Sequence, residues 1–318
     1  MLSTASLSEN CMQQPPISAI VTICAQQKRF RPETAATPAA LDKKLQSEVE
    51  LAWQHIVACL PEVATASDLY AGRSFGLAKV AAVNSKAPLF VISAGLGLIS
   101  GDTLAPAYGL TVARNVPESI ASKVDGEFDP QHWFSSLMAS GRSVGWEQVG
   151  CDGSGLILVA LTKPYAEMVG ESLAKASPKI LERVRIFGAN LSRALPEALH
   201  PAIAPYDDRL DTIAPGTKSD FAQRALLHFV DCVAVRPSDR RREFETVSAL
   251  LSRVTAPQRP NRMQRSDAEL ISLIRERIQP RASASSLLRQ LRDNDGIACE
   301  QGRFARLFRT ALIDEAAA

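Results

Sequence analysis

The chain has 318 residues, of which 46% are hydrophobic and 22% charged, and its formal net charge is +2. This length exceeds the roughly 100–200 residues of one typical domain and fits two. The apolar fraction argues against a largely disordered chain. No apolar run reaches the ~18 residues that a membrane span needs, and the polar first sixteen residues lack the basic and apolar regions of a secretion signal. We therefore expect a soluble, cytoplasmic protein.

Cysteine and histidine are too sparse and scattered for a metal site. The six cysteines form no CxxC pair, and only four histidines occur. Zinc sites combine closely spaced Cys and His ligands. We therefore expect no metal, no other cofactor, and thiols kept reduced in a cytosol.

Four short apolar runs predict buried strands, at residues 18–24, 89–93, 156–162 and 184–188. Helical patterns separate or follow them, at residues 37–60, 75–83, 117–139 (in pieces), 163–176 and 220–234. Alternating strands and helices indicate an α/β domain whose four-stranded parallel sheet is flanked by helices. Ligands of such sheets bind outside the carboxyl ends of the strands. The loops after the four strands are therefore where we look for a site.

Basic charge gathers toward the C-terminus. From Arg236 onward the chain holds 16 Arg, no Lys and 11 acidic residues, a net charge of +5, whereas the rest has a net charge of −3. Clustered basic charge is typical of phosphate binding, and arginine suits bidentate contacts. A solvated helical surface would also explain the pattern.

The basic region reads as an all-α module of short helices, at residues 240–254, 267–278, 284–292 and 299–312, with a turn at Gly296. This pattern predicts a helix-turn-helix-like DNA-binding module, the alternative being a plain helical bundle. Its candidate DNA contacts are Arg289, Arg292, Arg303, Arg306 and Arg309. The expected organisation is a flexible arm (1–17), an α/β domain (18–235) and the Arg-rich module (236–318).

The stretch 91–111, VISAGLGLISGDTLAPAYGLT, is the most informative part of the first domain. Its glycines, including Gly95, predict a backbone cradle for a ligand, although no P-loop, GxSxG or HExxH motif is present. We expect Ser93, Asp102 and Tyr108 on one long loop. Asp102 is the candidate for stabilising the oxocarbenium-like transition state of N-glycosidic cleavage, and Tyr108 for contacting the base. An ordinary turn would also explain Asp102.

Other polar and aromatic residues flank the strand ends and are candidate substrate-binding residues. They are Gln26, Gln27, Lys28, Arg29, Phe30, Tyr70, Arg73, Lys163, Tyr165 and Asp208. Each alone is equally consistent with solvent exposure, and the carboxylates of residues 207–220 with a salt-bridged brace between the domains. The hypothesis depends on their meeting at one edge of the sheet.

Three stretches, TICAQQKR, DLYAGRSFGLA and VISAGLGLISGDTLAPAYGLT, together resemble an uncharacterised bacterial family. That family is similar to the uracil-DNA glycosylase-like superfamily and to glycosylase-like domains of deazaguanine tRNA-modification enzymes, and its members often occur near anti-phage defence genes. The resemblance covers residues 18–230. It implies a four-stranded parallel glycosylase fold that cleaves a base from its sugar after flipping the nucleotide into a pocket.

The chain departs from uracil-DNA glycosylases at two places. Gln26, Gln27 and Lys28 stand where the activating Asp follows the first strand, and the loop after the fourth strand reads GANLSRALP in place of an HPSP-like His loop. The resemblance therefore implies a base other than uracil, such as a bulky modified cytosine of phage DNA.

The leading expectation is a DNA glycosylase, a hydrolase acting on N-glycosyl bonds, with duplex DNA as partner. Two alternatives remain open: a non-catalytic DNA-binding or nucleotide-sensing protein, and a nucleoside hydrolase or transferase acting on small molecules.

Overall fold

The structure, a computed structural model, describes residues 17–25, 28–33, 36–114, 116–151, 155–234, 239–258, 262–277 and 283–316. The flexible arm expected at residues 1–17 lies almost entirely outside them. The chain divides into two compact units, residues 1–256 and 257–318.

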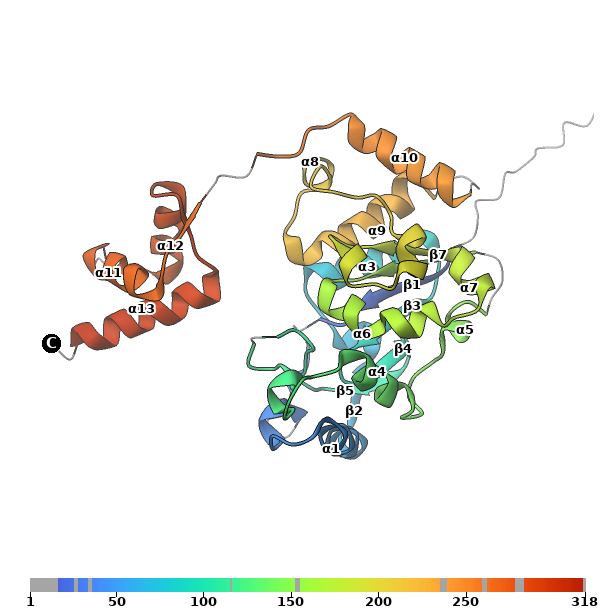
Figure 1. The fold of residues 1–318 in the computed structure, drawn as a ribbon, viewed down its shortest axis with the longest axis horizontal. Coiled ribbons are helices and arrows are strands. Elements are labelled where there is room, and N and C mark those ends of the chain that lie inside the picture. The colour runs from blue at the N-terminus through green and yellow to red at the C-terminus, as the bar shows by residue number, and fades with distance from the viewer. Residues whose placement is uncertain are drawn as a thin grey trace, which may run out of the picture. The chain divides into compact units, whose positions relative to one another are not determined.

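A five-stranded sheet forms the centre of the first unit (Figure 1). Its strand order is β4-β3-β1-β6-β7. The strands β1 (Ile17–Ile23), β3 (Leu89–Ser93), β6 (Leu156–Ala160) and β7 (Val184–Phe187) are parallel, as the four apolar runs predicted. The fifth strand, β4 (Gly97–Ser100), pairs with β3 in the antiparallel direction. The α/β class with a mostly parallel sheet is thus confirmed, with one extra edge strand.

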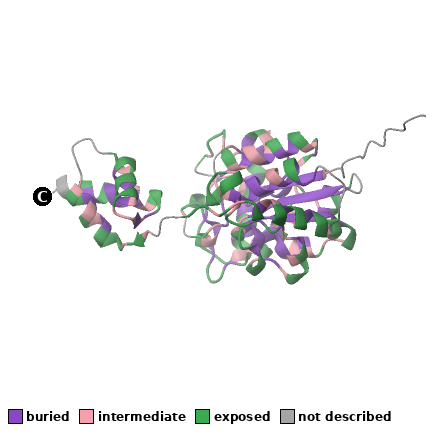
Figure 2. Ribbon diagram, turned by 90° about the horizontal axis from the view of Figure 1, so that it is seen from above, coloured by how far each residue is buried: buried purple, intermediate pink, exposed green. Residues whose placement is uncertain are grey.

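Helices cover both faces of the sheet. The side chains of β1 alternate between the faces: Ala19 and Val21 join one core, and Ile20 joins the other. The first core packs against α1 (Gln46–Cys59), α4 (Pro130–Met138) and α6 (Lys163–Ala174), and the second against α3 (Arg73–Ser85) and α9 (Phe221–Cys232). Figure 2 shows the buried strands between these layers.

Short elements complete the first unit. The strands β2 (Glu62–Thr65) and β5 (Leu104–Pro106) form a separate antiparallel pair. The short helices are α2 (Ala66–Leu69), α5 (Trp146–Val149), α7 (Pro178–Arg183) and α8 (Leu210–Ile213), and 3-10 turns lie at Pro38–Ala40, Ile120–Lys123, Leu191–Arg193, Glu197–Ala202 and Lys218–Asp220. The helix expected from residue 37 is therefore only a 3-10 turn there, and α1 begins later.

Helix α10 (Arg240–Ser252) belongs to the first unit, although the sequence placed it with the C-terminal module. Val247 and Leu251 are buried in the second core, and Glu243 forms a buried ion pair with Arg185 of β7. The boundary therefore falls after residue 256 rather than at 236. The second unit, which begins at residue 257, then holds 11 Arg and 8 acidic residues, a net charge of +3 instead of +5.

The second unit is built from α11 (Asp267–Arg277), α12 (Ala284–Asp293) and α13 (Gln301–Ala316), with the two-residue parallel strands β8 (Met263–Gln264) and β9 (Ile297–Ala298). Its core contains Phe304, Leu307, Phe308 and Ala311, the face predicted from sequence. Ser283 caps α12, and Gly296 turns the chain with φ +61°. In the described ranges, no helix is both long and apolar enough to cross a membrane.

Candidate functional site

The strand order places a crossover switch beside β1. The chain passes from β1 to β3 on one side and then to β6 on the other. Crevices at the carboxyl ends of strands form at such switch points. Here the Cys24 Sγ, just beyond β1, lies 3.1 Å from the hydroxyl of Tyr165, in the first turn of α6 after β6. Side chains from both strands therefore meet across the switch point.

Three buried hydroxyl groups join at the same edge. The Tyr108 hydroxyl lies 2.5 Å from the Ser93 Oγ and 2.8 Å from the Tyr70 hydroxyl, which also donates to the Ser93 Oγ at 3.4 Å. Ser93 ends β3, whereas Tyr70 and Tyr108 come from loops. Burial raises the pKa of both phenols well above the usual range, so both stay neutral.

The turn after Ser93 is rigid and filled. The Ser93 Oγ accepts the backbone N–H groups of Gly95 and Leu96, and the indoles of Trp133 and Trp53 donate to the carbonyls of residues 94 and 95. A Cβ on Gly95 would lie 2.8 Å from the Tyr108 ring. Gly95 is therefore a glycine so that Tyr108 can pack, and this turn is not the open ligand cradle expected from the sequence.

Lys28 lies over the tyrosine rings. Its Nζ is 4.7 Å from the Tyr108 ring centroid and 5.6 Å from that of Tyr70, and it donates to the Ala25 carbonyl at 3.3 Å. Such cation–π contacts favour the charged amine. Burial opposes them and lowers the pKa of Lys28, while the neighbouring Cys24 and Glu118 partly offset this effect. We call Cys24, Lys28, Tyr70, Ser93, Tyr108 and Tyr165 the edge cluster.

The first unit also holds a cleft of about 860 Å³, and no residue of the edge cluster is among its described lining residues. The first turn of α6 contributes Lys163 to the cleft and Tyr165 to the cluster, and Val112 lines the cleft next to the buried Thr111, which bonds to Tyr165. Its charged lining consists of Arg114, Lys163, Arg193, Glu127, Asp129 and Glu167. Arg114 and Arg193 are exposed cations that were not predicted as site residues, because nothing in their local sequence distinguishes them.

Asp102 does not lie near the edge cluster at the carboxyl ends of the parallel strands. Residues 94–96 form a tight turn, and β4 then runs back along β3, so Gly101 donates to the carbonyl of Leu89 at the start of β3. With a rise of about 3.3 Å per residue, Leu89 is roughly 13 Å from Ser93 along the strand. Asp102 is therefore exposed near the amino-terminal end of β3, at the opposite end of the strands from the edge cluster. The expected long loop carrying Ser93, Asp102 and Tyr108 is therefore corrected to a hairpin that separates Asp102 from the others.

The other residues predicted to bind substrate do not belong to the edge cluster. Gln26 and Gln27 lie outside the described residues, and Arg29 and Phe30 are exposed. Lys163 is exposed and forms an ion pair with Glu167 at 3.7 Å. Asp208 lines a separate cleft of about 590 Å³ beyond β7.

Arg73 belongs to a structural network and not to the edge cluster. It pairs with Asp220 at 3.0 Å, and Asp220 and Asp211 both bind the buried Arg224 at 2.8 Å. These charges tie the 205–220 loop to α3 and α9, all within the first unit. The brace foreseen for these carboxylates is present, but it does not join two domains.

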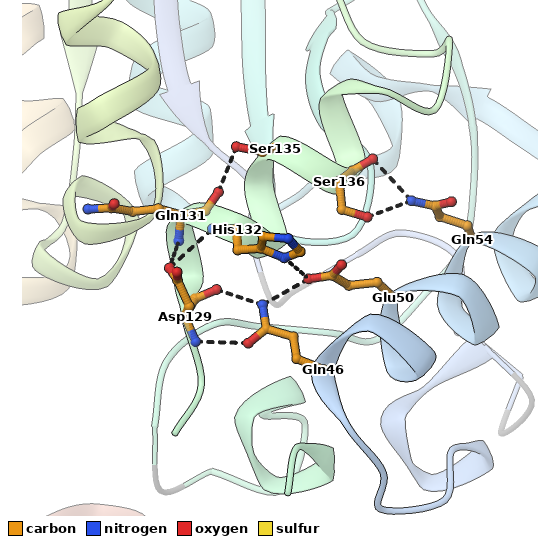
Figure 3. Close-up of polar contacts among 8 residues, drawn as sticks. All are labelled: Gln46, Glu50, Gln54, Asp129, Gln131, His132, Ser135 and Ser136. Carbon is orange, nitrogen blue, oxygen red and sulfur yellow. Dashed lines mark hydrogen bonds and ion pairs between the residues drawn. The ribbon is translucent and has the colours of Figure 1, made fainter. Parts of the chain in front are cut away.

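A second polar cluster joins α1 to α4 and was not anticipated (Figure 3). The Nδ1 of His132 lies 2.9 Å from the Oε1 of Glu50, whose side chain is only 6% exposed. Gln46 donates to the same carboxylate, and Asp129 caps α4. The hydrogen bond and the charge of Glu50 raise the pKa of His132. Glu50 and His132 are 82 residues apart, so no local motif could reveal the pair.

The five arginines predicted to bind DNA divide into two groups. Arg303 pairs with Asp267 at 2.6 Å and Arg292 donates to the carbonyl of Cys299 at 2.6 Å, so both brace the second unit. The other three are exposed: Arg289, Arg306 and Arg309. Two clefts, of about 240 and 400 Å³, share Arg262 and Arg292 in their lining.

Within the described ranges, no group of three or more His, Cys, Asp or Glu side chains is placed to hold a metal ion. Comparison with known proteins adds no relative: no family model, curated protein or solved structure matches the chain.

Proposed function

We propose that the chain is a DNA glycosylase that removes a modified base, such as a hypermodified cytosine of phage DNA, and leaves an abasic site. One observation carries the proposal: residues from four separate segments, Lys28, Tyr70, Ser93 with Tyr108, and Tyr165, meet at the carboxyl edge of the sheet beside the switch point. Lys28, Tyr70, Ser93 and Tyr108 lie in the three stretches that carry the resemblance to glycosylase-like proteins. Tyr165 lies outside those stretches, in the first turn of α6 after β6.

The cleft that shares the first turn of α6 with the edge cluster has a size suited to a nucleotide. Its volume of about 860 Å³ falls within the usual size of small-molecule sites, roughly 300–1,000 Å³. Arg114, Lys163 and Arg193 in its lining can contact phosphates, although three carboxylates of the same lining offset their charge, and the half-exposed Phe30 can stack on a base. The exposed arginines of the second unit add sequence-independent phosphate contacts.

Base release is the direct test. The full-length protein is incubated with genomic DNA carrying either ordinary or phage-modified cytosines. Alkaline cleavage scores abasic sites, and mass spectrometry identifies a released base. Release from the modified DNA alone would establish the activity and its substrate. No release from any DNA would overturn the proposal.

A non-catalytic nucleotide-binding protein is the second candidate. It is favoured by one observation: the hydroxyls of Tyr70, Ser93 and Tyr108 bond to one another and are buried. Buried hydroxyls that satisfy one another's hydrogen-bonding capacity stabilise the local structure, and this structural role alone explains their arrangement without catalysis. This candidate predicts DNA binding without abasic sites.

A further inference from the structure

Lys28 is fixed in position by its backbone. It follows β1 and forms an antiparallel bridge with Tyr70, and the next residue, Arg29, donates its N–H to the carbonyl of Leu69 at 3.0 Å. The start of the side chain is therefore held against the loop that carries Tyr70. A nucleophile must be positioned in this way before it can react efficiently.

The amine has aromatic neighbours in place of a counter-ion. Within the described residues, no carboxylate lies at ion-pair distance from the Lys28 Nζ, whereas Lys43, Lys79 and Lys163 each pair with an acid. The rings of Tyr108 and Tyr70 lie beside it at 4.7 and 5.6 Å. Burial disfavours the charged amine, although the ring contacts favour it, and a neutral lysine amine is a nucleophile toward a sugar or carbonyl carbon.

The other reactive groups of the edge cluster are already engaged. The Tyr108 hydroxyl bonds to both Ser93 and Tyr70, and the Cys24 thiol bonds to Tyr165. Asp102, which would activate a water in a purely hydrolytic reaction, lies at the opposite edge. Of the groups described in the cluster, Lys28 has the chemistry and the partial exposure to attack a substrate.

We propose that Lys28 is the nucleophile of the site and forms an imine with C1′ of the deoxyribose. The lone pair of the neutral amine forms a bond to C1′ while the bond to the base breaks, and the base leaves with that electron pair and one amine proton. The remaining N–H proton moves to O4′ as the C1′–O4′ bond breaks, which gives the imine. Water then hydrolyses the imine to the free amine and the abasic aldehyde. This inference rests on the proposed function and names its reactive group.

Borohydride trapping on DNA that already contains an abasic site tests the inference independently of base release. The amine condenses with the open-chain aldehyde with loss of water, and the hydride reduces the imine to a stable secondary amine. Full-length protein is mixed with a labelled abasic duplex and sodium borohydride. Covalent adducts are separated on a denaturing gel, and peptide mass spectrometry maps the attachment site in the wild-type protein.

Two variants serve as a matched pair. Lys28→Arg keeps the charge and the ring contact but cannot form an imine, and Lys43→Arg makes the same change at an exposed lysine of the first unit that belongs neither to the edge cluster nor to the cleft lining. We expect an adduct at Lys28, reduced at least about tenfold in Lys28→Arg and by less than about twofold in Lys43→Arg. No wild-type adduct, or one mapped to another amine, would overturn the inference, even if base release were observed. An adduct at Lys28 without base release would retain the amine chemistry and overturn the glycosylase instead.

Discussion

The thiol of Cys24 and the hydroxyl of Tyr165 lie 3.1 Å apart across the switch point between β1 and β6. This contact joins the ends of two neighbouring parallel strands at the edge where ligands of such sheets bind. Burial and the neighbouring Cys24 raise the pKa of Tyr165, so its hydroxyl stays protonated. The contact therefore fixes one wall of the edge cluster and adds no charge to it.

Removing the central hydroxyl of the cluster should destabilise the first unit. Tyr108→Phe removes the two short contacts of the Tyr108 hydroxyl and leaves Tyr70 only its longer 3.4 Å hydrogen bond to Ser93, and we expect a loss of about 1–3 kcal/mol in the free energy of unfolding. Urea denaturation monitored by tryptophan fluorescence measures it. A loss below about 0.5 kcal/mol would show that the hydroxyl network contributes little.

The ion pair between Arg185 and Glu243 should hold α10 on the first unit. Glu243→Gln leaves a buried guanidinium without its counter-ion, and we expect a loss of about 3–5 kcal/mol. Glu245→Gln, which breaks the exposed pair with Arg241 on the same helix, should cost less than about 1 kcal/mol. Equal losses in the two variants would mean that α10 is not anchored by this pair.

The contact between His132 and Glu50 predicts a pH-dependent contribution to stability. Because the folded-state pKa of His132 is raised, the contribution is fully present below the unfolded-state pKa of about 6.5 and is lost as the pH rises through the folded-state value. Asp129 adds to the rise, and the exposed ring keeps the effect small. Wild type should exceed His132→Gln in stability by more at pH 5.5 than at pH 9 in urea denaturation. A difference that does not change with pH would contradict this account.

DNA affinity should depend on the exposed arginines of the second unit. Replacing Arg289, Arg306 and Arg309 with Ala should weaken binding to any duplex, and each lost phosphate contact should reduce the slope of log K against log salt by about 0.9. Arg241→Ala, an exposed arginine of the first unit, is the control. Fluorescence anisotropy over a salt series measures both quantities. Unchanged affinity in the triple variant would exclude this surface as the DNA contact.

Much of the fold could be predicted because its signals are local. The apolar run 89–93 coincides with β3, and Ser283 caps α12 as its position indicated. The meeting of Lys28, Tyr70, Ser93 and Tyr165 at one edge could be anticipated as well. Parallel strands present their carboxyl ends together, so residues just after each strand meet.

Two predictions were wrong because the local sequence pattern showed neither where the chain reverses direction nor against which element a helix packs. Gly97 turns the chain with φ +81°, and the four residues of β4 are too few to show a strand pattern, so the hairpin that removes Asp102 from the site was read as a loop. In α10, three consecutive arginines concealed the contacts of Val247 and Leu251 with the first unit. Burial against a distant element is a tertiary property that local composition does not encode.

Base release by two variants compared with wild type tests most directly whether the site is at the carboxyl edge. Lys28→Arg alters the edge cluster, and Asp102→Asn alters an exposed carboxylate at the opposite edge of the same sheet. On DNA with modified cytosines, we predict that Lys28→Arg lowers the rate of base release at least about tenfold, whereas Asp102→Asn stays within about twofold of wild type. Loss of release in Asp102→Asn with full release in Lys28→Arg would contradict the account.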